Sequence, residues 1–387
     1  MPNKEKNIPK RRFKEFENAD AWELRKLNNI ADVRDGTHNS PQYIEFGYPL
    51  VTSKNIKNGQ VNFEDIQYIS SFDYEEINKR SKVNINDILM GMIGTVGNLA
   101  LVREEPEFAI KNVALIKNIG VVNVEFLYHY LGSYVIEKQL LNSLDGGTQK
   151  FISLNKIRHL NITFPTHPEQ EAIGTFFSTL DRHITLHQRK LDKLKSVKQA
   201  YLSEMFPAEG ERVPKRRFPG FTDAWELRKL VNEVLFIGTG KSKFSALEFG
   251  EFEILGSTSV IGYDNSYDYE GDFILTARVG ANAGELYRHS GKVKISDNTV
   301  FIQGDGLDFI FYILQHFDIK KLSFGTGQPL VKASELKELK ILMPVSVKER
   351  NHVGTFFSTL DRHITLHQRK LEKLKNLKKA LLNELFV

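Results

Sequence analysis

The chain has 387 residues, of which 41% are hydrophobic and 26% are charged, and it contains no cysteine. Disulfides and thiolate metal sites are therefore excluded, and the length predicts two domains or a repeated unit. The net charge of +5 favours a polyanionic partner only weakly, because it is spread over a large surface and fits a merely basic globular protein equally well.

The N-terminal segment, residues 1–19, lacks the apolar run of a secretory signal. It is followed by no stretch of about 18 apolar residues, the length that could span a bilayer. We therefore expect a cytoplasmic protein with no membrane partner.

Each half of the chain opens with the same signature. The residues DAWELRKL stand at 20–27 and return at 223–230, and the residues RRF stand at 11–13 and return at 216–218. A repeat of this kind predicts two units built on one frame.

The region before the first long helix, residues 20–165, is called the first insert here, and it has a mixed pattern of strand-like and helix-like runs. Residues 113–117 predict a short strand and residues 124–141 predict a helix. The run GGTQK ends at residue 150 and precedes a helical SLNKIRHL.

A long helix is predicted at 166–206. Pro168 suits the first helical turn, Glu169 and Glu171 lie beside the positive end of the helix dipole, and Pro207 ends the helix. About 39 residues at ~1.5 Å each give a helix of about 58 Å.

The second half repeats this order. After a linker at 207–219, the second insert at 220–344 has strand-like runs at 251–255 and 299–303 and a helix-like run at 308–322. We infer that both inserts share an α+β fold. A second long helix is expected at 345–387.

Both long helices carry a heptad pattern in which eight of ten a and d positions are apolar or aromatic. The polar exceptions are His187 and Lys198 in the first helix and His367 and Lys378 in the second. We expect the helices to pair as an antiparallel coiled coil about a pseudo-twofold axis, with one insert at each end. In the alternative, each helix packs only on its own insert.

The sequence GTFFSTLDRHITLHQRKL occurs at 174–191 and again at 354–371 without one difference. A coiled-coil seam explains identical a and d residues but not identical outer residues. Either a recent duplication or recombination copied the segment, or the same partner protein docks on both copies. The docking candidates are Thr175, Ser178, Asp181, Arg182, Gln188 and Arg189, with Thr355, Ser358, Asp361, Arg362, Gln368 and Arg369 in the second copy.

This arrangement resembles the specificity (S) subunit of type I restriction-modification enzymes, and the resemblance covers essentially the whole chain. It rests on the two divergent inserts, on the Gly-Thr-Gln-Lys run at 147–150, and on the proline before each long helix. The resemblance implies that each insert is a target recognition domain for one half of a bipartite sequence in double-stranded DNA. The helices would act as spacer and as docking surface for two methyltransferase subunits.

The resemblance also implies that the chain has no catalysis and no cofactor of its own. S-adenosylmethionine would belong to the methyltransferase partner, and ATP and Mg to a restriction subunit where one joins the complex. The second helix departs from the pattern, because residues 347–350 read VKER where the first helix begins with Pro-Glu-Gln.

Three motifs suggest catalysis or metal binding, and each has a simpler interpretation. Residues 238–242 resemble the end of a phosphate-binding loop, but Leu235 stands where the motif needs its first glycine. His183 and His187 have helical metal-ligand spacing, yet His187 falls in the seam. Glu335 and Lys337 resemble a nuclease core, and surface charges on a helix explain them better.

Base edges are read by Arg, Lys, Asn and Gln, and phosphate contacts fix the register. The candidates for DNA contact in the first insert are Thr37, His38, Asn39, Lys54, Asn55, Gln149 and Lys150, and those in the second are Lys241, Ser242, Lys243, Ser257, Thr258, Ser259, Arg278, Asn282 and Gln328.

A protein-interaction scaffold without DNA readout is an alternative function of another class. The salt dependence of binding would distinguish the two, because phosphate contacts release counterions.

Overall fold

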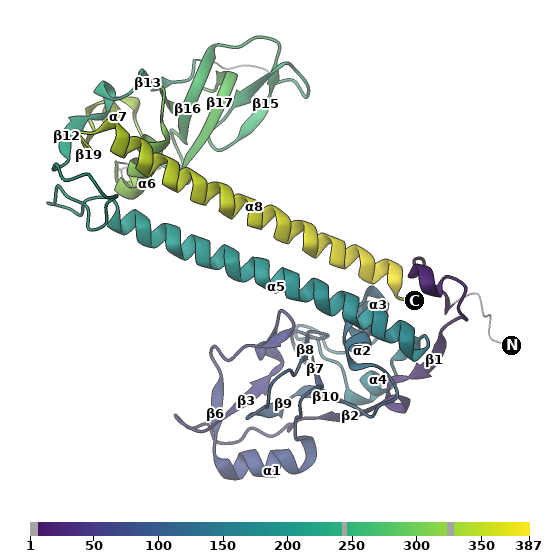
Figure 1. Ribbon diagram of the computed structural model, residues 1–387. Coiled ribbons are helices and arrows are strands. Elements are labelled where there is room, and N and C mark those ends of the chain that lie inside the picture. Colours follow the sequence, from purple (N-terminus) through teal and green to yellow (C-terminus); the bar gives the residue numbers. More distant parts are fainter. Residues whose placement is uncertain (1–6, 242–245, 323–328) are drawn as a thin grey trace. The chain divides into compact units, whose positions relative to one another are not determined.

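The computed structural model describes residues 7–241, 246–322 and 329–387 (Figure 1). The chain folds into two compact units. Unit 1 comprises Met1–His187 with Lys370–Val387, and unit 2 comprises Gln188–Arg369. Each unit therefore contains one insert and a part of each long helix.

The insert of unit 1 is built on small sheets. A four-stranded antiparallel sheet has the order β2-β10-β7-β8, a second sheet has the order β6-β3-β9, and two-stranded pairs join β1 to β11 and β4 to β5. The elements are β1 (Glu23–Lys26), β2 (Ala31–Asp35), β3 (Tyr48–Thr52), β4 (Ile56–Lys57), β5 (Gln60–Val61), β6 (Gln67–Ile69), α1 (Ser71–Ser81), β7 (Ile88–Gly91), β8 (Leu99–Leu101), β9 (Ala109–Lys111), β10 (Val113–Asn118), α2 (Val124–Leu131), α3 (Tyr134–Leu141), α4 (Leu154–Arg158) and β11 (Asn161–Phe164).

Strand β10 confirms the strand predicted at 113–117, and its first four residues are buried. The helix predicted at 124–141 is wrong as one helix, because the chain breaks between α2 and α3. The amide of Gly132 closes α2 by donating to the Tyr128 carbonyl at 3.2 Å, and Ser133 is extended before α3 begins. The break lets both Leu127 and Ile136 reach the same core.

The insert of unit 2 has one larger sheet, of order β13-β18-β16-β17-β14-β15, and the pair β12-β19. The helix predicted at 308–322 ends early, because Asp318 adopts a left-handed backbone with φ 57°. The elements are β12 (Glu226–Lys229), β13 (Phe236–Thr239), β14 (Phe252–Leu255), β15 (Val260–Asp264), β16 (Tyr269–Ala277), β17 (Leu286–Ile295), β18 (Thr299–Gln303), α6 (Asp308–Phe317), α7 (Ala333–Glu338) and β19 (Lys340–Met343).

The two long helices are α5 (His167–Glu204) and α8 (Val347–Leu385), as their heptad pattern predicts. Within unit 1 the start of α5 lies beside the end of α8 in antiparallel direction. The rings of Phe177 and Phe386 lie 5.6 Å apart, and Lys378 Nζ lies 2.6 Å from Asp181 Oδ1.

Unit 2 contains the corresponding contacts between the end of α5 and the start of α8. The rings of Phe206 and Phe357 lie 5.8 Å apart, and Lys198 Nζ lies 2.6 Å from Asp361 Oδ1. Each contact of unit 1 maps onto its counterpart when residue numbers are shifted by about 180, the spacing of the repeated helices. The two units thus use one internal plan.

The core of unit 1 contains residues of both long helices and of the insert. Ile173 and Phe177 of α5 and Leu385 of α8 are buried together with Phe126 of α2. Pairing of the helices and packing of each helix on its own insert, which the sequence presented as alternatives, therefore occur in the same core. In the part of the chain that the structure describes, none of the helices is apolar over enough length to cross a membrane.

Candidate nucleic-acid interface and helix groove

The loop after β2 begins at a glycine that touches the neighbouring strand. The Gly36 amide donates to the Val113 carbonyl at 3.0 Å, and the Thr37 amide donates to the Ile110 carbonyl at 3.0 Å. A Cβ on Gly36 would lie 2.1 Å from the Ile110 oxygen, so only glycine allows this approach. The contact places Thr37, His38 and Asn39 beside the turn between β9 and β10.

A second loop, after β3, is pinned to the same turn. The Ser53 hydroxyl donates to the Asn112 carbonyl at 2.9 Å and accepts from the Met92 amide at 3.0 Å. Lys54 is exposed. Asn55, which the sequence placed among the DNA contacts, is 3% exposed, and its carboxamide oxygen accepts from the Thr52 amide and hydroxyl. The structure corrects this expectation, because Asn55 holds the turn together.

A third loop carries Gln149 and Lys150. The Gly94 amide donates to the Lys150 carbonyl at 3.0 Å, and the Ile152 amide donates to the Met92 carbonyl at 2.9 Å. Both Gln149 and Lys150 are exposed. The structure therefore brings the three predicted segments of the first insert together.

Residues of the first loop and residues that follow Lys150 line a hollow of about 550 Å³. Asp35, 4% exposed, lies at its base and accepts from His38 Nε2 at 2.8 Å and from Arg80. His38 Nδ1 lies 2.8 Å from Asn112 Oδ1. The lining residues are Asp35, His38, Met92, Ile93, Asn112, Phe151, Ile152, Ser153, Leu154, Asn155 and Arg158.

Unit 2 repeats this loop geometry with other side chains. The Gly240 amide donates to the Thr299 carbonyl at 3.1 Å, and the Ser257 hydroxyl donates to the Asn298 carbonyl at 3.2 Å. The Gly280 amide donates to the Pro329 carbonyl at 3.0 Å. These bonds correspond to those of Gly36, Ser53 and Gly94, so the two inserts position equivalent loops.

The predicted contacts of the second insert occupy these loops. Gly238 is part of strand β13, so residues 238–242 do not begin with a phosphate-binding loop. Lys241, Thr258, Ser259, Arg278 and Asn282 are exposed and Ser257 is half-buried, whereas Ser242, Lys243 and Gln328 lie outside the described residues.

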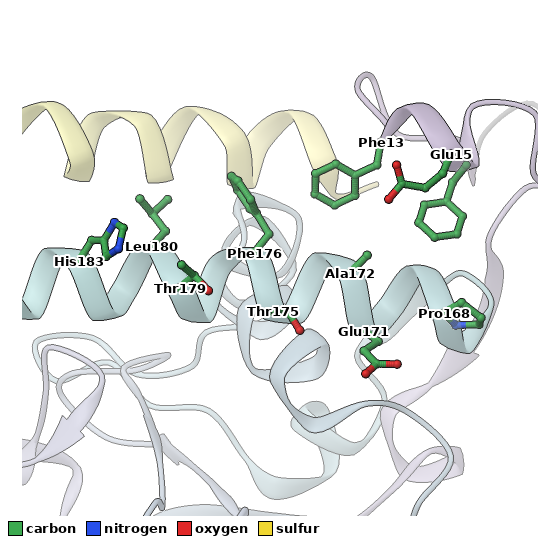
Figure 2. A pocket seen from close by; sticks show the side chains of 11 residues that line it. Phe13, Glu15, Pro168, Glu171, Ala172, Thr175, Phe176, Thr179, Leu180 and His183 are labelled. Carbon is green, nitrogen blue, oxygen red and sulfur yellow. The ribbon is translucent and has the colours of Figure 1, made fainter.

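A groove of about 800 Å³ runs along α5 in unit 1, and Figure 2 shows its lining. One wall is a stripe of α5 at helical spacing, which includes Ala172, Thr175, Phe176 and Thr179. The other wall is the N-terminal segment with Phe13, Glu15 and Phe16. Six of the eleven lining residues are apolar, and five of the eight that α5 contributes lie inside the duplicated sequence.

A buried ion pair fixes the N-terminal segment beside α5. Arg12 Nε donates to Glu169 Oε1 at 2.7 Å, and the Glu169 side chain is fully buried. Hydrogen bonding to Glu169 raises the pKa of Arg12. In unit 2, Arg217 and Glu349 form the same pair at 2.6 Å, and Phe218 lies 6.0 Å from Phe356.

The docking candidates divide into two groups. Asp181 and Asp361 were expected on the outer face, and this is wrong, since they pair with Lys378 and Lys198 between the helices. Ser178 donates to Glu125 of its own insert. Gln188 donates to Asp192, and Ser358 donates to the Thr355 carbonyl. The other docking candidates have exposed side chains: Thr175, Arg182, Arg189, Thr355, Arg362, Gln368 and Arg369.

One buried titratable group lies next to Asp181. Burial and the nearby charges of Lys378 and Arg103 lower the pKa of His129 to about 2. The imidazole is therefore neutral at physiological pH. Its counterpart in unit 2 is Tyr312, whose hydroxyl donates to Asp361 Oδ2 at 2.7 Å and whose pKa is raised by burial.

Several residues of these sites were not predicted from the sequence. Asn112 and Asn298 lie at the centre of the loop clusters, and Phe13 and Thr179 line the groove. The repeated RRF motif indicated the groove, because the arginine in the middle of each copy pairs with a glutamate at the start of a long helix. The sequence carried no comparable signal for the two asparagines, whose neighbours in the chain differ.

The chain matches the sequence model of the family described as type I restriction modification DNA specificity domain, over residues 19–196 and 202–376. It is 24% identical to a putative type I restriction enzyme MjaX specificity subunit of Methanocaldococcus jannaschii, with 98% of this chain and 96% of that protein covered. It is 25% identical to the type I restriction enzyme EcoBI specificity subunit of Escherichia coli, over 49% of this chain and 42% of that protein.

Its fold is similar to the crystal structure of the S subunit of a type I restriction-modification system from M. genitalium. The TM-score is 0.74 at 17% identity, and 98% of this chain and 99% of that chain are covered. The fold of this chain is therefore one that is known from experiment.

Proposed function

Because the chain belongs to the family of type I restriction-modification DNA specificity subunits, we propose that each of its two inserts reads one half of an asymmetric bipartite DNA target. One observation carries this proposal. Both units hold their loops by equivalent backbone bonds, from Gly36 and Gly94 in one and from Gly240 and Gly280 in the other, yet they expose different side chains. One scaffold with two sets of exposed donors and acceptors suits two different half-sequences.

The charges at these loops support contact with DNA. Lys54 and Lys150 are exposed in unit 1, and Lys241 and Arg278 are exposed in unit 2. Lysine and arginine beside base-reading loops supply phosphate contacts that fix register. Binding should therefore weaken steeply with salt, which a protein-interaction scaffold would not show.

The spacer of the target would be set by α5 and α8, paired as an antiparallel coiled coil about a pseudo-twofold axis. Each of these helices is continuous, with 38 and 39 residues, and contributes to both units. The matched pairs Asp181–Lys378 and Asp361–Lys198 support a fixed register between them. A fixed register would keep the unspecified gap between the half-sequences constant.

Two methyltransferase subunits would dock on the duplicated sequence, one at each copy. The groove beside α5 supports this proposal, because Thr175, Phe176 and Thr179 line it and recur as Thr355, Phe356 and Thr359. Apolar grooves of this kind receive an amphipathic helix of a partner. S-adenosylmethionine would enter with those subunits and ATP and Mg with a restriction subunit, so this chain would contribute recognition and no catalysis.

An exchange of one insert tests the proposal. Residues 28–165 are replaced by the corresponding insert of another specificity subunit, and methylated sites are mapped by sequencing host DNA. One half of the methylated sequence should change and the other should stay. A change of both halves, or of neither, would contradict independent reading by the two inserts.

A further inference from the structure

Two asparagines occupy equivalent positions in the loop clusters of the two units. The Gly36 amide donates to the carbonyl of Val113, the residue after Asn112, and the Gly240 amide donates to the carbonyl of Thr299, the residue after Asn298. These positions coincide although the surrounding sequences, IKNVA and SDNTV, differ.

The backbone of each asparagine is held by a serine from the neighbouring loop. The Ser53 hydroxyl donates to the Asn112 carbonyl at 2.9 Å, and the Ser257 hydroxyl donates to the Asn298 carbonyl at 3.2 Å. The serine therefore fixes the main chain at each asparagine.

Both asparagine side chains are accessible in the loop clusters. Asn112 lines the hollow of unit 1, where its Oδ1 lies 2.8 Å from His38 Nδ1. Asn298 is exposed, and its side chain has no hydrogen bond among the residues that the structure describes. The exposed cations Lys54 in unit 1 and Arg278 in unit 2 belong to the same loop clusters.

A left-handed backbone conformation explains why asparagine occupies only one of these two positions. Asn112 has φ 53°, a left-handed conformation that asparagine tolerates well. Asn298 is not among the described residues with positive φ, so any small polar residue could fold there. A side chain that recurs without a shared folding reason points to a shared ligand.

We propose that Asn112 and Asn298 each read one base of their half-sequence, and that this base is adenine. A carboxamide is both donor and acceptor, and it matches the N7 acceptor and the N6 donor that adenine presents in the major groove. Ser53 and Ser257 are positioning residues that hold each asparagine at the required depth. This inference rests on the proposed function, because it assigns residues within the two readers.

The test uses the full chain in complex with its methyltransferase subunits. Wild type, Asn112→Ala and Asn298→Ala are each used to select DNA from a pool with randomised half-sequences. Asn112→Ala should relax one adenine position in one half-sequence, and Asn298→Ala should relax one adenine position in the other. The preference lost at each position should be on the order of 5- to 150-fold.

Asn118→Ala is the matched control, since Asn118 is exposed at the far end of the same strand β10. It should leave the selected sequence unchanged. Melting temperatures and complex masses of all variants establish that they fold and assemble. Asn112→Gln and Asn298→Gln keep the amide at a different reach and should give partial relaxation at the same positions.

Unchanged selected sequences in both alanine variants, or a uniform loss of affinity without a relaxed position, would overturn the inference. A relaxed position that is not adenine would overturn the assignment of the base. Failure of the proposed function gives a different result, because the wild-type complex would then select no sequence at all.

Discussion

At the scale of residues, the two units place different side chains against an equivalent aspartate. Asp181 and Asp361 each lie between the long helices and each face a lysine of the opposite helix. The insert of unit 1 places neutral His129 against Asp181, at 3.9 Å, whereas the insert of unit 2 places the Tyr312 hydroxyl against Asp361, at 2.7 Å. The histidine makes this position of unit 1 sensitive to acid, whereas the tyrosine at the equivalent position of unit 2 does not titrate in the acid range.

We predict that His129→Tyr makes unit 1 less sensitive to acid. The lowered pKa of His129, about 2, means that the folded chain resists a proton that the unfolded chain accepts near pH 6.5. Stability is therefore full above pH 6.5 and falls as the pH drops from there toward 2, by up to about 1.4 kcal/mol per pH unit.

Denaturant unfolding at pH 7.5 and pH 5 measures this effect. Between these values wild type should lose ~2 kcal/mol more stability than His129→Tyr does. Tyr312→Phe is the control, because it removes a hydroxyl at the equivalent position and should leave the acid dependence as in wild type. Equal losses in wild type and His129→Tyr would contradict the prediction.

At the scale of elements, the ion pairs between α5 and α8 explain two breaks in the heptad pattern. Lys198 and Lys378 occupy seam positions that are otherwise apolar, and each reaches an aspartate of the other helix. The pairs are partly exposed, so each contributes only on the order of 1 kcal/mol. Their main effect is on register, because a shifted helix would leave two charges unpaired.

We predict that charge reversal at one pair is damaging and that double reversal repairs it. Asp181→Lys places two lysines together and should lower the melting temperature by a few degrees. Asp181→Lys with Lys378→Asp should restore most of that loss, as measured by thermal unfolding followed by circular dichroism. Additive losses in the double variant would show that the pair does not couple the helices.

The groove beside α5 gives a prediction about stoichiometry. Thr179 is exposed in the groove wall, so Thr179→Arg should fill the groove with charge and block one docking site. The mass of the purified complex should then correspond to one methyltransferase subunit instead of two. Thr359→Arg added to it should remove both.

Gln199→Arg is the control for this experiment, because Gln199 is an exposed residue of α5 outside the duplicated sequence. It should leave two methyltransferase subunits bound. Two subunits retained by Thr179→Arg would exclude the groove as the docking site.

The sequence predicted the periodic elements well and the irregular ones poorly. The buried apolar run of β10 and the heptads of α5 and α8 follow from spacing alone. The break at Gly132 depends on tertiary packing, because both α2 and α3 must reach one core, and single-residue patterns do not record that. The partners of Lys198 and Lys378 were hidden because they lie on the opposite helix.

The candidate site was predicted in its segments but not in its details. The predicted residues at 37–39, 54–55 and 149–150 lie on three loops, which the structure brings together in unit 1. Asn55 was misplaced because a polar residue in a loop can serve the loop itself, as its bonds to Thr52 show. Whether such a residue contacts DNA or holds its own loop depends on the exposure of its side chain. That exposure follows from the folded structure and cannot be read from the sequence.

At the scale of the whole molecule, the two inserts are joined by α5 and α8, and the proposed spacer role gives a prediction. Insertion of four residues near Ser196 should lengthen α5 by ~6 Å at ~1.5 Å per residue. At ~3.4 Å per base pair, the gap between the half-sequences should grow by roughly one to two base pairs, with both half-sequences retained. Single-molecule mapping of methylated sites measures the gap, and an unchanged gap at full activity would contradict the spacer role.

Unit 1 is assembled from the two ends of the chain. Its core contains Phe386, which packs on Phe177 and Trp22, and the Val387 carbonyl accepts from the Tyr130 hydroxyl at 2.7 Å. Unit 2 consists of one continuous stretch, Gln188–Arg369. Residues 188–369 are therefore translated before residues 370–387, which contribute to the core of unit 1. Until residues 370–387 have left the ribosome, Phe177 and Trp22 lack the ring of Phe386 that packs on them.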